Sequence, residues 1–226
     1  TNGLKQNNMK KQKLNHGDIF YLNYNEKYLF GRVLFDVDKQ CNQPHIVVEY
    51  DNYIRSFGGC QLIEMYKGIY SSIEDFSLDN KEILISRVFC YNIDSRINKL
   101  PYCKIGFEKV DYTKVEFPEV LGNLNLEIQL LRGELAFATN FKEDPKEFRV
   151  AYGAESPLVI AHAVLVLQNR RDLIEGYQRD EYLVKGDLLY HPVFRNKIYK
   201  DIGINPEISY YDLAKQKGFD LARFYI

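Results

Sequence analysis

The sequence lacks tryptophan, long apolar runs and an excess of charge of either sign. Its 30 basic and 31 acidic side chains leave a formal net charge of −1, so no overall field attracts nucleic acid or an anionic membrane. It has no stretch of about eighteen apolar residues, the length that a membrane-spanning helix needs. The N-terminal lysines are not followed by an apolar run, so no secretory signal is visible. We therefore expect a cytoplasmic protein that binds neither nucleic acid nor a membrane.

Closely spaced cysteines are also missing. The cysteines are far apart and form no C-x-x-C pair: Cys41, Cys60, Cys90 and Cys103. The four histidines do not fall beside them at the spacing that zinc sites use. In a chain without an export signal, we expect reduced and mostly buried thiols. We also expect no metal and no other cofactor.

The residues present in quantity are tyrosine and phenylalanine, with 18 and 14 copies. Tyrosine combines apolar area with a hydrogen-bonding tip, which suits binding surfaces. The same residues suit ordinary β-sheets, and an AT-rich genome favours their codons. We prefer the compositional explanation, so the aromatic content alone does not indicate a binding site.

Two apolar runs separated by a polar turn organise the first part of the chain, at residues 17–35. Residues 19–22 and 28–35 are dense in β-forming side chains and residues 25–27 supply the turn, which predicts a β-hairpin. Because both faces of each strand carry large apolar side chains, the hairpin should be covered on both sides. Gly31 lies inside the second strand, where glycine weakens the sheet unless it permits a bulge or a close backbone approach. We therefore expect a bend there.

The same stretch resembles the opening signature of a known family. The matching residues are Gly17-Asp18-Ile19-Phe20 and, after the turn, Lys27-Tyr28-Leu29-Phe30-Gly31-Arg32-Val33-Leu34. They are similar to the start of the immunity protein 26 family of bacterial polymorphic toxin systems. The resemblance implies a cytoplasmic antidote that binds and neutralises a cognate toxin domain. It covers a small part of the chain and transfers no catalytic or toxin-contacting residue.

Further segments rich in β-formers follow the hairpin. We predict strands at residues 45–50, 60–66, 82–89, 102–107, 126–135 and 148–152, with loops at residues 36–44, 51–59, 71–81, 91–101 and 111–118.

The last third of the chain has helical signals. Ser156-Pro157 is a helix start, but residues 158–168 are apolar almost all round, which fits a buried helix or a central strand. We favour the helix. We predict a second helix at residues 192–202 and a third after Ser209, which resembles a capping box with Asp212. Asp220 should cap a final turn.

These elements predict an α+β protein. Its N-terminal part would be a mostly antiparallel, β-rich body, either a hairpin-led sheet or a partial barrel, with a C-terminal helical portion packed on it. The lysine-rich residues 1–16 should form a flexible tail, and residues 17–226 a single α+β domain of the immunity type.

No arrangement of residues indicates catalysis. A serine nucleophile in a G-x-S-x-G setting is missing. His162 lies inside an apolar run and is better explained as a hydrogen-bonded core histidine than as a catalytic one. The adjacent carboxylates resemble solvated loop residues, although a hydrolase that uses loop carboxylates stays open as an alternative. A general protein-interaction module is a further alternative. We predict that the chain is not an enzyme.

The loops around residues 36–53 offer the best candidate for a binding surface. Acidic groups and tyrosines gather there in the sequence: Asp36, Asp38, Glu49, Tyr50, Asp51 and Tyr53. They could face a basic toxin surface, because complementary charge speeds association and buried aromatics hold a complex. Ordinary loop acids are the competing explanation. The predicted partner is the C-terminal domain of a cognate toxin, bound one to one.

Overall fold

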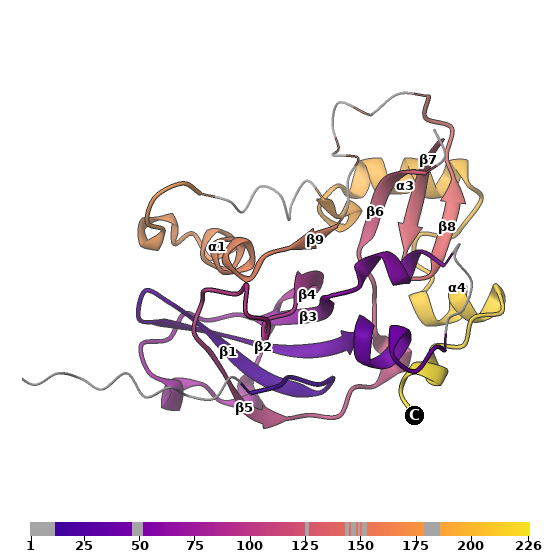
Figure 1. Ribbon diagram of the computed structural model, residues 1–226. Helices are drawn as coiled ribbons and strands as arrows, with labels where there is room; N and C mark the ends of the chain where they lie inside the picture. Colours follow the sequence, from indigo (N-terminus) through magenta and orange to yellow (C-terminus); the bar gives the residue numbers. More distant parts are fainter. Residues whose placement is uncertain are drawn as a thin grey trace, which may run out of the picture.

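A six-stranded mixed sheet forms the body of the protein, as the computed structural model shows (Figure 1). The structure describes residues 12–46, 52–124, 127–142, 145, 148, 150, 153–178 and 186–226. The strands lie in the order β5-β1-β2-β3-β4-β9. Their bounds are β1 (Asp18–Tyr24), β2 (Lys27–Asp36), β3 (Cys60–Tyr66), β4 (Ile83–Tyr91), β5 (Tyr102–Phe107) and β9 (Ala154–Glu155). All neighbours pair antiparallel except β4 and β9, which pair parallel.

The predicted hairpin is confirmed as β1 and β2. Asn25 and Glu26 form the turn with φ of 47° and 61°, the positive values of a two-residue turn whose twist matches the strands. Both strands are almost fully buried, as the apolar side chains on their two faces predict. The close approach expected at Gly31 is present, but the register shift lies further along, between Val33 and Phe35.

Helix α1 (Pro157–Leu167) covers one face of this sheet (Figure 1). Ser156 begins it, because its side chain accepts a hydrogen bond from the Val159 N–H and Pro157 occupies the first turn. The segment is therefore a helix, as predicted, and not a central strand. His162 is 2% exposed and lies 3.2 Å from the Tyr24 hydroxyl, which confirms it as a buried, hydrogen-bonded histidine.

A second, three-stranded antiparallel sheet packs at one end of the first. Its strands are β6 (Glu119–Leu124), β7 (Glu127–Arg132) and β8 (Leu135–Ala138). An apolar cluster joins Phe35, Leu62 and Phe89 of the large sheet to Val120 and Leu131 of the small one. The other face of the small sheet is covered by α3 (Pro192–Asp201).

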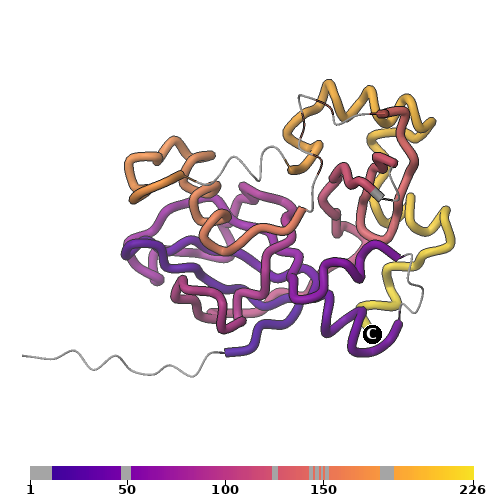
Figure 2. The backbone as a smooth tube through the Cα atoms, turned by 45° about the horizontal axis from the view of Figure 1, so that its top comes forward, coloured from indigo at the N-terminus to yellow at the C-terminus, as the bar shows by residue number. Residues whose placement is uncertain are grey.

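The C-terminal segment completes the cluster between the sheets. Helix α4 (Tyr210–Gln216) begins at Ser209, whose side chain accepts from the Asp212 N–H at 3.1 Å, as the capping-box pattern predicts, and donates to the Asp212 carboxylate at 2.8 Å. Asp220 caps the final 3₁₀ turn. The end of the chain lies beside the segment that follows β2 (Figure 2), where the Gln40 side chain donates to the Phe224 carbonyl at 2.9 Å.

Several predicted boundaries differ from the structure. The strand predicted at residues 126–135 is instead the β7–β8 hairpin, whose turn contains Gly133 at a φ of 58°. Strand β6 was not predicted. The loop predicted at residues 36–44 contains a wide helical turn, Asp38–Asn42. Most of the strands predicted at residues 45–50 and 148–152 lies outside the described residues.

The tail predicted at residues 1–16 is packed at its C-terminal end. Leu14 is fully buried, and its N–H donates to Asp94 at 3.0 Å. His16 packs edge-on against Tyr225, with ring centroids 5.4 Å apart. Residues 12–16 therefore belong to the folded body, and residues 1–11 lie outside the described residues.

The α+β architecture with a β-rich N-terminal body is as predicted. The cysteines are free thiols, and only Cys103 is partly exposed. In the described ranges, no helix is both long enough and apolar enough to cross a membrane.

Candidate functional site

The Gly17-Asp18 pair of the resembling stretch fixes the start of β1. Gly17 has a φ of 87°, and a Cβ added there would lie 2.5 Å from the Phe107 ring. The Asp18 side chain is almost fully buried, accepts the Asn15 N–H at 2.8 Å and pairs with the Lys104 ammonium at 2.6 Å. Gly17 and Asp18 therefore tie the start of β1 to β5 and to the segment that precedes β1.

The Gly31-Arg32-Val33 element ties β2 to β3 in a similar way. A Cβ on Gly31 would lie 2.5 Å from the Glu64 carbonyl oxygen, so only glycine fits this approach. Arg32 donates to the Glu64 carboxylate at 2.9 Å and lies 3.3 Å from that of Glu108. Val33 is fully buried. These residues thus form the internal contacts of the sheet.

The acidic surface predicted around residues 36–53 needs correction. Asp36 is 1% exposed because it accepts from the Gln61 amide at 3.1 Å and pairs with Lys39 at 3.3 Å. Tyr53 is 6% exposed, with its ring packed edge-on against Phe57 at 5.4 Å. Neither side chain is available to a partner in this conformation.

Of the remaining candidates, Asp38 lies in the described part of the chain and makes structural contacts. The half-buried Asp38 carboxylate accepts from the Gly59 N–H and from the Asn42 amide, both at 3.0 Å, so it closes the helical turn onto the next loop. Glu49, Tyr50 and Asp51 lie outside the described residues. The side chains of Asp36, Asp38 and Tyr53 therefore hold parts of the fold together.

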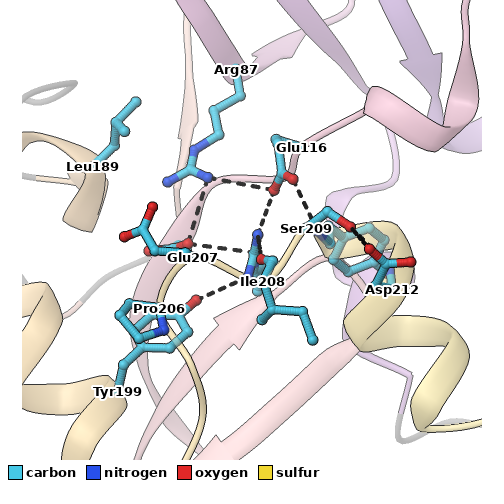
Figure 3. A network of polar contacts seen from close by, with 12 residues as sticks. Arg87, Glu116, Leu189, Tyr199, Pro206, Glu207, Ile208, Ser209 and Asp212 are labelled. Atoms are coloured by element: carbon cyan, nitrogen blue, oxygen red, sulfur yellow. Dashed lines mark hydrogen bonds and ion pairs between the residues drawn. The ribbon is translucent and has the colours of Figure 1, made fainter.

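Sequence reasoning missed a buried network of charges between the two sheets (Figure 3). Arg87 on β4 donates two hydrogen bonds to Asp187, each 2.9 Å long. The same carboxylate accepts the Glu119 N–H at 3.2 Å. A two-point arginine–carboxylate contact is among the strongest pairings in proteins.

Glu119 at the start of β6 is the centre of the network. Its side chain is fully buried, and Arg195 holds it with contacts of 2.5 and 2.9 Å. Arg132 and Arg87 lie 3.5 and 3.6 Å away. Burial alone would raise the pKa of Glu119, but the hydrogen bond from Arg195 and the nearby arginines outweigh it and lower the pKa. The group therefore stays ionised.

The network also holds the connection into α4. Arg132 donates to the Ile208 carbonyl at 3.1 Å and to Glu116 at 2.5 Å. Arg195 donates to the Pro206 carbonyl at 2.6 Å. Glu116 accepts the Tyr210 N–H at 2.9 Å, and Figure 3 shows Arg87 and Glu116 pointing toward each other. Arg132 and Arg195 therefore fasten residues 206–210 to β7 and α3, and Glu116 links Tyr210 to Arg87 of the large sheet.

The chemistry of this network is electrostatic. The hollow beside it, lined by Arg87, Glu155 and Asp187, has a volume of about 10 Å³, which is room for a single water molecule. A general acid at neutral pH needs a carboxyl pKa raised toward 7, whereas that of Glu119 is lowered. The arrangement can hold charge in place, and Glu119 is not poised to donate a proton.

A weak signal in the sequence points to this network. Arg87 interrupts the apolar run of β4, and Arg132 ends the alternating run of β7. A charge at an inward strand position must find a partner or destabilise the fold. The sequence does not say which residue that partner is, because Asp187 lies 100 residues after Arg87.

Within the described ranges, no group of three or more His, Cys, Asp or Glu side chains is placed to hold a metal ion. Compared with known proteins, the chain matches no family model, no curated protein and no solved structure.

Proposed function

We propose that this chain is an immunity protein of a bacterial polymorphic toxin system. It would act in the cytoplasm and bind the C-terminal domain of a cognate toxin one to one. Inhibition would be stoichiometric, without turnover and without a cofactor.

The observation that carries this proposal is the placement of the resembling residues. Gly17, Asp18, Gly31 and Arg32 belong to one continuous set of contacts that joins β1, β2, β3 and β5. A signature built from such residues marks a fold, because each has a packing or pairing requirement that other residues do not meet. This supports reading the resemblance as a shared architecture, and function then follows by analogy.

The hydrolase alternative has less support. Two acids next to the hairpin, Asp36 and Asp38, already accept hydrogen bonds from backbone and side-chain donors. The buried carboxylates Glu119 and Asp187 are paired with arginines. Binding is thus the simpler use of this fold.

The test is a pull-down from the native host with the tagged chain as bait, followed by mass spectrometry. We expect to recover the C-terminal domain of a large secreted protein in near one-to-one amount. Co-expression of that domain should arrest growth of a bacterial host, and the chain should restore it. Recovery of nothing, or of nucleic acid, would contradict the proposal.

A further inference from the structure

The loop between β4 and β5, residues 92–101, exposes an apolar side chain at its tip. Ile97 is 84% exposed, and the cationic side chains of Arg96 and Lys99 are exposed on either side of it. Tyr91, just before the loop, is 53% exposed. We call residues 92–101 the Ile97 loop.

Internal hydrogen bonds give this loop a defined shape. The Asn98 side chain, 9% exposed, donates to the Ile93 carbonyl at 2.8 Å and accepts the Leu100 N–H at 2.9 Å. The Ile97 N–H donates to the Ser95 hydroxyl at 3.0 Å. The tip is therefore presented in one conformation, which reduces the entropy lost on binding.

The base of the loop is fastened to the body. The Ile93 N–H donates to the Gln61 side chain at 3.2 Å, and the Ile93 side chain is fully buried. Asp94 is 6% exposed and accepts the Leu14 N–H at 3.0 Å. Asp94 and Asn98 are buried because their side chains hold hydrogen bonds at the base of the loop, whereas Ile97 at the tip is exposed.

The exposed charged residues of the loop, Arg96 and Lys99, are both cationic. Across the described residues, no ion pair joins Arg96 or Lys99 to an acid. At the base of the loop, the Lys13 ammonium is 4.0 Å from the buried Asp94 carboxylate, and 76% of the Lys13 side chain is exposed. An apolar side chain flanked by two cations complements an acidic surface with an apolar recess.

We propose that the Ile97 loop contacts the toxin domain, with Ile97 inserting into an apolar recess and Arg96 and Lys99 meeting acidic groups around it. This inference rests on the proposed function. It differs in sign from the acidic interface expected from the sequence, since Asp36 of that interface lies inside the body and the exposed charged groups of this loop are cations.

The experiment compares variants of the full chain for binding to the purified toxin domain recovered in the pull-down. Ile97→Asp should raise the Kd by about 30-fold or more, as expected for an interface hot spot. The double variant Arg96→Glu/Lys99→Glu should slow association by about 10-fold at low salt and less at high salt. The matched control is Val193→Asp, because Val193 is another β-branched residue with 85% exposure and should not contribute.

The outcomes separate the two proposals. If the unmodified chain does not bind the toxin domain, the proposed function fails and this inference fails with it. If the unmodified chain binds and Ile97→Asp binds equally well, only this inference fails. Equal losses for Ile97→Asp and Val193→Asp would also overturn it. So would Ile97-dependent binding to phosphatidylserine vesicles together with unchanged toxin binding, because the loop would then be a membrane contact.

Discussion

At the scale of single residues, the protein depends on buried charges that neutralise one another. Arginine and carboxylate groups meet where the two sheets and the C-terminal segment join: Arg87, Arg132, Arg195, Glu116, Glu119 and Asp187. Taking an ion out of water costs several kcal/mol unless a partner and further hydrogen bonds replace the lost hydration. The ion pairs therefore mainly offset the cost of burying these charges, and they add little stability beyond that.

Removing one member of a buried ion pair should therefore lower the stability of the fold. Arg87→Met leaves Asp187 buried without its arginine, so we expect the free energy of unfolding to fall by about 3 kcal/mol or more. The measurement is denaturant unfolding followed by circular dichroism. The double variant Arg87→Met/Asp187→Leu should recover part of the loss, because it removes both charges. Equal stability of the single variant and the unmodified protein would show that the network contributes nothing.

The network also predicts a dependence on pH. The pKa of Glu119 is lower in the folded chain than its ordinary value of 4.5, so its contribution to stability is complete above that value. The contribution is lost as the pH falls below 4.5 through the folded value. Unfolding free energies measured from neutral to acid pH should therefore fall less steeply for Glu119→Gln. The slopes should differ by up to about 1.4 kcal/mol per pH unit. Identical slopes would contradict this assignment.

At the scale of elements, the sequence predicted those segments whose signals are local. The β1–β2 hairpin follows from its β-forming runs and polar turn, and α1 and α4 from the caps Ser156 and Ser209. Strand β6 was missed because it contains Glu119, Gly122 and Asn123, which have low strand propensity. It is a strand because it pairs with β7 and because arginines hold Glu119.

The difference between local and long-range signals also explains which features of the candidate site were not predicted. Asp36 has the sequence of an exposed loop acid, but its carboxylate accepts from Gln61, which is 25 residues away. Arg87 and Asp187 are 100 residues apart. A single sequence does not show which residues pair over such distances, so the partners of the buried charges could not be predicted even where the strands were.

The approach of β2 to β3 can be tested with a pair of glycines from the large sheet. A Cβ on Gly31 would meet the Glu64 backbone oxygen at 2.5 Å, so Gly31→Ala should lower the unfolding free energy by about 1–3 kcal/mol. On Gly106 in β5, the nearest atom to an added Cβ is 3.8 Å away, so Gly106→Ala should be neutral or slightly stabilising. Thermal unfolding of both variants is the measurement. Equal effects would mean that the contact at Gly31 is not tight.

At the scale of the whole molecule, the resembling residues are internal and a different part of the chain faces outward. The hairpin strands are interior strands of the large sheet, and α1 and α4 pack on that sheet. The Ile97 loop is fastened to that body through Gln61 and Leu14, so a rigid scaffold presents an exposed apolar tip. Proteins commonly place binding residues on loops positioned in this way.

The most direct test of the central claim is a titration of toxin activity with the purified chain. Inhibition by one-to-one binding predicts that activity falls linearly and ends at one equivalent when the toxin concentration is well above the Kd. The Val193→Asp variant should give the same endpoint. Full toxin activity at excess chain would contradict the account. Loss of activity at far less than one equivalent would also contradict it, because it would mean that the chain acts with turnover as an enzyme.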